Sequence, residues 1–267
     1  MKRFVNSKSI PLLVLLSSLV AMLLRIWTRG SGPDAEGLFA PKPLVWGLLW
    51  LLTLATAAAI LFAVWRLRNS PEYRDNYPKS VVSGLCAVPA ALCMLVVSYH
   101  QLRDSVALVL PQTTAVDTVT GIFGLVAGLC LLLSAVHRCM GKKPFFVING
   151  LICIYFALRL FNRCQIWSNE PKIGIVVFPF LASMTLMLGS YQRVCFDVDL
   201  GNRRWSALWC LMSVYLCVVA MFSFEQTLFY GLCALWQMGD LCSLRPLKKR
   251  KPRYEISEEA QMPEAEE

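Results

Sequence analysis

The segment PLVWGLLWLLTLATAAAILF, residues 43–62, contains twenty consecutive residues without a charged side chain. An α-helix rises about 1.5 Å per residue, so such a segment reaches across the roughly 30 Å hydrocarbon core of a bilayer. Apolar segments of similar length recur along the 267 residues, of which 57% are hydrophobic and 16% are charged. Soluble domains are about 45–50% apolar and about 25% charged. The sequence therefore predicts an all-α, polytopic integral membrane protein.

Eight segments are long and apolar enough to be expected as transmembrane helices. They are residues 9–28, 43–65, 79–100, 114–138, 145–165, 172–192, 204–223 and 226–242. The last segment is short and contains Asp240, so a bundle of seven helices is the alternative. The first follows Lys2, Arg3 and Lys8 as a signal peptide would, but no small-residue cleavage site follows it, and we expect it to be retained.

The positions of lysine and arginine predict the orientation, because cytoplasmic segments of membrane proteins carry an excess of both. With eight spans and a cytoplasmic N-terminus, 19 of the 26 lysines and arginines fall on the cytoplasmic side. Seven spans would place the basic C-terminal segment on the opposite side, against this rule. We therefore expect eight spans, both termini in the cytoplasm, and a location in the cell membrane.

Residues 1–243 are expected to form one helical bundle, because the connections between spans are too short to hold a soluble domain. Residues 244–267 begin basic and end acidic, which predicts a disordered cytoplasmic tail. The basic half would lie beside the bilayer and could bind anionic lipid, although a simple topology anchor explains it equally well. Besides the lipid bilayer, an unknown protein is a candidate partner. Nucleic acid is not expected, because the charges lie in short clusters between apolar segments.

The sequence lacks the motifs of metalloproteases, serine hydrolases and nucleotide-binding loops, so no enzymatic activity and no cofactor is expected. His100 and His137 are predicted at opposite membrane faces and cannot share a metal ion. The eleven cysteines are an odd number, lie mostly in apolar segments, and are expected to be free thiols. Gly121, Gly124 and Gly128 recur at helical spacing and indicate a surface where two helices pack closely.

A polar stripe near the outer end of span 145–165 is the main candidate site, together with acidic residues expected at the same level. The cluster comprises Tyr155, Arg159, Asn162, Arg163, Asp117, Glu170 and Glu225. A charged side chain at mid-bilayer costs about 2.5–3.5 kcal/mol, and less near the surface. Arg159 therefore either extends to the surface, or pairs with Glu225 or Asp117 as a clamp between helices, or lines a vestibule for a small polar or anionic solute. The structural role is the stronger expectation, because extension costs little so close to the surface.

A second polar group is expected at the inner end of the bundle. It comprises Asn149, Asp197, Asp199, Asn202 and Asp240. Asp197 and Asp199 could chelate a cation, but two carboxylates are few for a calcium site, and a network of aspartates and arginines is the stronger expectation. Asp240 is expected either to pair with Arg138 or to face water.

The segments WSNEP (167–171) and YQRVCFDVDLGNRRW (191–205) carry a family resemblance. Over roughly residues 155–225 the chain resembles multi-pass membrane proteins of anaerobic Gram-positive bacteria, a group without an assigned activity. The resemblance implies a bacterial cytoplasmic membrane, and it assigns no functional residue.

Three functions remain open from the sequence. The first is transporter-like handling of a small polar or anionic solute, for which Pro89, Gly174, Pro179 and Gly189 mark positions where helices could be interrupted. The second is a structural, assembly or sensory role through a protein partner. An intramembrane enzyme is the third and has no recognisable catalytic residues.

Overall fold

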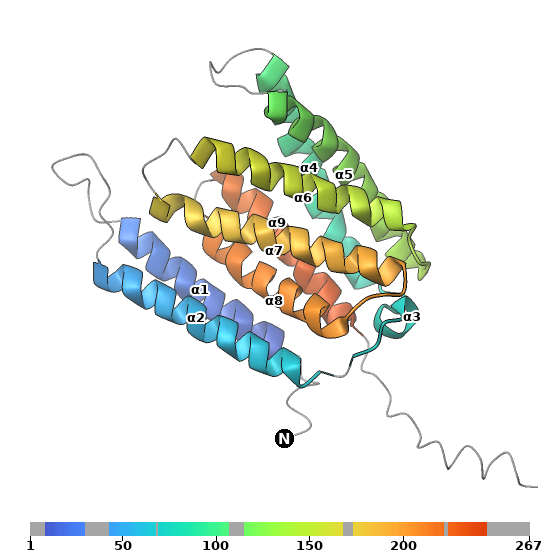
Figure 1. Ribbon diagram of the computed structural model, residues 1–267, viewed down its shortest axis with the longest axis horizontal. Coiled ribbons are helices and arrows are strands. Elements are labelled where there is room, and N and C mark those ends of the chain that lie inside the picture. The colour runs from blue at the N-terminus through green and yellow to red at the C-terminus, as the bar shows by residue number, and fades with distance from the viewer. Residues whose placement is uncertain are drawn as a thin grey trace, which may run out of the picture.

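The computed structural model describes residues 9–29, 43–67, 69–106, 115–167, 173–221 and 224–244, and over these residues the chain is helical (Figure 1). Nine helices are present in this part of the chain. They are α1 (Ser9–Arg29), α2 (Pro43–Trp65), α3 (Tyr73–Asn76), α4 (Val81–Val106), α5 (Ala115–Met140), α6 (Phe146–Trp167), α7 (Ile173–Asp197), α8 (Arg203–Ala220) and α9 (Phe224–Ser243). The predicted all-α fold is confirmed. The tail beyond residue 244 lies outside the described residues.

Five of the long helices are apolar enough to cross a membrane, which supports the prediction of a membrane protein. The segments are Ile10–Trp27, Leu44–Trp65, Val81–Ser105, Ala115–Met140 and Phe146–Gln165. The eight long helices follow the eight predicted segments closely, and α4 and α7 each continue for more than a turn beyond them.

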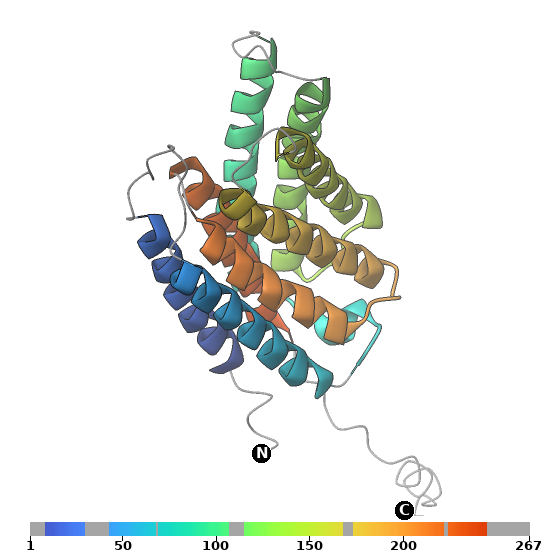
Figure 2. The same ribbon diagram turned by 60° about the vertical axis from the view of Figure 1, so that its left-hand side comes forward.

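Six of the helices close into a ring. Each of α4, α5, α6, α7 and α8 packs against the next helix in the chain, and α9 packs back against α4. Helices α1 and α2 pair with each other and pack against α8 from outside the ring. Figures 1 and 2 show this pair at one edge of the molecule and the pair α4–α5 at the opposite edge. Because α8 has neighbours on all sides, most of its residues are buried.

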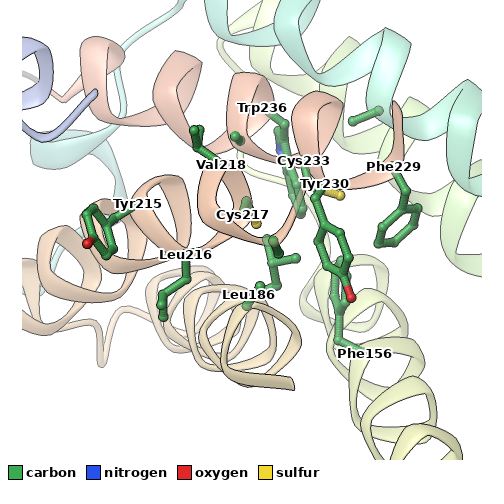
Figure 3. Close-up of a cluster of buried hydrophobic side chains, with 14 of the residues drawn as sticks. Phe156, Leu186, Tyr215, Leu216, Cys217, Val218, Phe229, Tyr230, Cys233 and Trp236 are labelled. Carbon is green, nitrogen blue, oxygen red and sulfur yellow. The ribbon is translucent and has the colours of Figure 1, made fainter. Parts of the chain in front are cut away.

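Large side chains fill the interior of the ring. Figure 3 shows Phe229, Tyr230 and Trp236 of α9 on the side of that helix that faces Phe156 of α6. All four side chains are almost completely buried. The rings of Phe156 and Trp236 stack with 6.4 Å between their centroids, so aromatic contacts join α6 and α9 across the ring.

Glycines allow α4 and α5 to approach each other closely. A Cβ atom on Gly124 would lie 2.0 Å from the Oγ of Ser98, and one on Gly128 would lie 2.7 Å from the side chain of Leu95. Gly121 faces the backbone of α4 in the same way. The prediction that these three glycines form a helix-packing surface is confirmed.

Helix α5 ends in a Schellman motif built on glycine. Gly141 has a φ of 72°, and its N–H donates to the carbonyl of Arg138 over 3.2 Å. The N–H of Lys142 donates to the carbonyl of His137 over 2.9 Å. These two bonds satisfy carbonyls that the end of a helix would otherwise leave without a partner.

Helix α7 ends in the same motif, with an aspartate in the left-handed conformation. Asp199 has a φ of 58°, and its N–H donates to Phe196, while the N–H of Leu200 donates to Cys195. The Nζ of Lys143, just beyond the end of α5, lies 2.5 Å from Asp199 Oδ2. This hydrogen bond lowers the pKa of the Asp199 carboxyl and joins the ends of the two helices.

The prolines of the segment RNSPEYRDNYPK, residues 68–79, are typical of a loop. The structure instead has the single-turn helix α3 within it, packed on the bundle. Tyr73 and Tyr77 form a buried cluster with Phe196 of α7, against which Leu244 packs. The N–H of Tyr73 donates to Asp199 Oδ1 over 3.0 Å. We call this end of the bundle, where α3 meets the α5–α6 and α7–α8 connections, the α3 end.

Candidate functional site

A cavity lies at the α3 end, with α3 on one side and side chains of the ring on the others. Its enclosed volume is about 20 Å³, which is room for about one or two water molecules, and it opens to solvent on one side. Its wall holds four ionisable side chains from three helices and three aromatic rings. These are Arg138, Arg193, Asp197 and Asp240, with Tyr73, Tyr77 and Trp236. The wall therefore combines charged and aromatic side chains.

Asp240 of α9 lies between two arginines in this wall. Arg138 Nη2 of α5 is 2.8 Å from Asp240 Oδ1, and Arg193 Nη2 of α7 pairs with Oδ2. Ser83 of α4 donates its hydroxyl to Oδ1 over 2.5 Å. The three charged side chains are at most 9% exposed. The predicted pair of Arg138 and Asp240 is confirmed, and it is a buried pair that links four helices with Arg193 and Ser83.

Aromatic rings cover one face of each guanidinium. The Cζ atom of Arg138 lies 4.1 Å from the centroid of the Tyr77 ring, and that of Arg193 lies 4.0 Å from the Trp236 ring. Arg193 also donates to Gln237 Oε1 over 3.0 Å. Stacking leaves the N–H groups at the edges of a planar guanidinium available for hydrogen bonds.

Two of these buried N–H groups have no acceptor in the described part of the chain, namely Arg138 Nη1 and Arg193 Nε. A buried donor without an acceptor costs about 1–3 kcal/mol, and more when it is charged. Natural structures retain few such groups, and those that remain often mark a functional site. Since carboxylate, phosphate and sulfate oxygens are the preferred acceptors of arginine, the arrangement can bind a small anion.

Asp197, the last residue of α7, has a different environment from Asp240. Its side chain is 6% exposed, and Oδ2 accepts a hydrogen bond of 2.6 Å from Asn149 Nδ2 of α6. Among the described residues Oδ1 has no hydrogen-bond partner and the carboxyl forms no ion pair. Asp197 lies beyond the predicted span 172–192, and burial raises the pKa of its carboxyl to about 7, which the hydrogen bond from Asn149 opposes.

Asp197 and Asp199, considered together as a cation site from the sequence, have separate partners. Asp197 is buried and bonded to Asn149, whereas Asp199 is exposed and bonded to Lys143. The prediction of a network of aspartates and arginines in the segment FDVDLGNRRW is wrong, because within the described residues Arg203 and Arg204 bond to Asn76 and to the carbonyl of Leu67 instead. Asn202, the remaining member of the group, caps α8 by accepting a hydrogen bond from the N–H of Arg204.

The opposite end of the ring holds part of the polar stripe predicted from the sequence. Arg159 Nη1 donates to the hydroxyl of Tyr155 over 3.1 Å, and its Cζ lies 3.9 Å from the centroid of the Phe229 ring. Arg159 is only 6% exposed, and its Nε has no hydrogen-bond partner in the part of the chain that the structure describes. No carboxylate of the described residues forms an ion pair with it.

Asp117, proposed from the sequence as a partner of Arg159, interacts with other residues. Its Oδ1 accepts hydrogen bonds from Asn162 Nδ2 over 2.6 Å and from Gln101 Nε2 over 3.3 Å. These bonds join α4, α5 and α6. Arg163 is half-buried on the same helix as Asn162. The remaining two residues of the predicted cluster are Glu170, which lies outside the described residues, and Glu225, whose side chain does.

A continuous series of contacts connects the two arginine-containing regions through the ring. Arg159 bonds to Tyr155, whose ring centroid lies 5.3 Å from that of the adjacent Phe156. Phe156 stacks on Trp236, which in turn lies under Arg193. The aromatic pair Phe156–Trp236 therefore separates the two regions of positive charge.

Arg193 and Trp236 belong to the site but were not predicted, although their spacing from the two aspartates contained a signal. Arg193 precedes Asp197 by four residues, and Trp236 precedes Asp240 by four. Residues at this spacing lie on one face of a helix. The pairs Arg193–Asp197 and Trp236–Asp240, each near the end of a span, could therefore have predicted that Arg193 and Trp236 lie at the same site as the aspartates.

Comparison of the chain with known protein families, with curated proteins and with solved structures gives no match. The functional interpretation therefore rests on the geometry of the cavity and of the residues around it.

Proposed function

We propose that this protein is a transporter-like membrane protein that binds a small anionic solute in the cavity at the α3 end. One observation carries the proposal: among the described residues, the two buried arginines of the cavity wall share a single carboxylate and retain N–H groups without acceptors. An anion between Arg138 and Arg193 would supply those acceptors. The cavity is small, so the proposed solute has few heavy atoms, such as a short carboxylate or an inorganic oxyanion, and side chains of the wall would have to move apart to admit it.

The proposal includes the predicted topology, with eight spans in the cell membrane and both termini in the cytoplasm. Under this topology the α3 end faces the cytoplasm. The basic residues in the connections at this end support the orientation. They include Arg66, Arg74, Lys79, Lys142 and Lys143. The basic segment 245–253, outside the described residues, would then lie at the cytoplasmic surface, where anionic lipid is its proposed partner.

Arg159 extends the proposal from binding to passage. A solute that leaves the cavity toward the other end of the ring meets the Phe156–Trp236 pair first and Arg159 next. The buried guanidinium of Arg159, which has no carboxylate partner among the described residues, would be a second place where an anion is stabilised. The aromatic pair would have to separate for the solute to pass, as alternating access requires.

Thermal unfolding of the full chain in nanodiscs tests the proposal. We expect acetate, sulfate or inorganic phosphate to raise the melting temperature, with a stabilisation of about 2.7 kcal/mol at a concentration one hundred times Kd. Arg193→Lys keeps the charge but loses the planar set of donors, so the anion effect should require at least about tenfold more anion. Arg66→Lys is the matched control, because Arg66 is exposed and stacks on Phe62 away from the cavity.

A flat response to every anion would contradict the proposal. The arginines around Asp240 would then act as a clamp between α4, α5, α7 and α9. In that case the structural or sensory role through a protein partner becomes the better explanation, and co-purification from native membranes is the measurement to make.

A further inference from the structure

Asp197 gives the cavity a binding site for a second species, a proton, and this inference rests on the proposed function. We propose that Asp197 is a proton-binding site, and that each anion entering the cavity is accompanied by one proton bound at Asp197 Oδ1. The proton comes from the solution at the α3 end, and no covalent bond other than this O–H changes.

The charge of the cavity wall is the first argument. Arg138 and Arg193 contribute two positive charges, and Asp240 and an ionised Asp197 contribute two negative ones. An anion added to this neutral wall would be an excess charge in a buried site, which is costly. Protonation of Asp197 leaves the wall with one positive charge, and a monovalent anion then restores neutrality.

Hydrogen bonding gives an independent argument. An ionised carboxylate can only accept hydrogen bonds, so Asp197 in that form repels an anion in the same cavity. Its Oδ2 is already bonded to Asn149, whereas Oδ1 has no partner within the described residues. A proton on Oδ1 converts this atom from a competitor of the anion into a donor to it.

Asp240 cannot take this role, because its oxygens are already occupied. Arg138 and Ser83 donate to Oδ1 and Arg193 pairs with Oδ2, so loss of its charge would leave two buried guanidinium groups without a counter-ion. The two carboxyls of the wall therefore have different roles, a permanent counter-ion and a proton acceptor. Environments that separate two acids in this way are typical of proton-coupled sites.

The ionisable groups around Asp197 come from every element that packs near it. They are Tyr73 of α3, Arg138 of α5, Lys143 of the α5–α6 connection, Arg193 of α7 itself and Asp240 of α9. The three cations lower the pKa of Asp197, but each is engaged elsewhere, Lys143 with Asp199 and both arginines with Asp240. Desolvation therefore dominates, and the carboxyl can be protonated near neutral pH.

Binding of acetate and of sulfate to the full chain in nanodiscs, measured by calorimetry at several pH values, tests the coupling. Both anions stay ionised between about pH 6 and about pH 9. For wild type we expect proton uptake to rise toward one per anion as the pH increases above about 7, where Asp197 of the free protein is ionised, and the affinity to fall about tenfold per pH unit over the same range. Asp197→Asn should bind with an affinity independent of pH and without proton uptake.

Asp199→Asn is the matched control. Asn tolerates the left-handed conformation of this position and keeps an oxygen for the N–H of Tyr73. This variant should still take up a proton with the anion, but over a lower pH range than wild type, because Lys143 loses its ion pair with Asp199 and lowers the pKa of Asp197 further. Anion binding that is independent of pH in wild type, or an unchanged pH dependence in Asp197→Asn, would overturn the inference and leave the proposed function intact. Absence of binding at every pH would refute both.

Ligand-free protein gives a second readout. The pKa of Asp197 is about 7 in the folded protein and 3.8 as the ordinary value, so between these values the folded state binds more protons. Stability contributed by the proton is present at low pH and is lost as the pH rises toward 7. The melting temperature of wild type should therefore fall between about pH 5 and about pH 7, and Asp197→Asn should lack this component. An identical pH profile in both proteins would contradict proton binding at Asp197.

Discussion

Arg159 is a guanidinium inside an expected membrane span, with one face on Phe229 and one N–H on Tyr155. No carboxylate among the described residues neutralises its charge. A buried charge without a counter-ion costs free energy in the folded protein. Under the proposed function this charge serves to attract the solute, whereas in a structural role it would act as a clamp between helices.

The first prediction separates the two roles of Arg159. Arg159→Gln should leave the melting temperature in nanodiscs unchanged or raised, because a buried charge is removed, while uptake of sulfate into proteoliposomes falls at least about tenfold. Asn162→Leu is the comparison, since it breaks the bond to Asp117 and should destabilise the protein by about 1–3 kcal/mol. A fall in stability with unchanged uptake in Arg159→Gln would identify Arg159 as a clamp.

Of the contacts between individual side chains, the sequence predicted some and missed others, and the difference has a physical reason. The pair of Arg138 and Asp240 was predictable because both residues end spans at the same expected membrane face. Arg193 was not linked to them, because its contact with Asp240 reaches from α7 to α9 across the interior of the ring. Periodicity along one helix does not report which other helix its polar face meets.

The eight long helices were predicted with most ends within three residues, since an apolar segment of about 20 residues has few alternatives in a bilayer. The C-terminal ends of α4 and α7 were missed by more than a turn. A further exception is α3, where a sequence with Pro71 and Pro78 indicated a loop. The single turn between these prolines packs through Tyr73 and Tyr77 onto Phe196. Tertiary contacts of this kind leave no periodic signal in the sequence.

The second prediction concerns the close packing of α4 against α5. Gly124→Ala should lower the melting temperature, because the added Cβ would meet Ser98 and also the ring of Tyr155, 2.8 Å away. Gly150→Ala in α6 is the control, since no atom lies within 4 Å of the added Cβ. There the change should be neutral or stabilising by up to about 1 kcal/mol, because alanine favours helix over glycine. Equal effects at both positions would show that the α4–α5 surface tolerates more space than the structure indicates.

The whole molecule consists of a ring of six helices with the pair α1–α2 attached to α8. The ring gives the buried charges a common interior, and the attached pair presents many apolar side chains to its surroundings. Its exposed leucines include Leu12, Leu16, Leu23, Leu51 and Leu54. A lipid environment is the simplest explanation for so much exposed apolar surface.

The third prediction tests the orientation of the bundle. Lys142 at the α3 end and Arg103 near the other end of the ring are both exposed. Reporter proteins fused after Lys142 should fold in the cytoplasm and fluoresce as green fluorescent protein fusions, whereas fusions after Arg103 should be active as alkaline phosphatase. The reverse pattern would place the cavity on the outer side of the membrane, and fluorescence at both sites would refute the alternation of spans.

The contact between α9 and α4 has a consequence for how the chain is made. Helix α9 is the last of the nine to leave the ribosome, and it alone closes the ring and supplies Asp240. Until then Arg138 and Arg193 have entered the bilayer without their carboxylate, while α4 to α8 form an open arc. The nascent protein therefore passes through a stage in which two arginines remain hydrated or are held by the insertion machinery. Arrival of one aspartate ends that stage, because Asp240 then pairs with both arginines as α9 closes the ring.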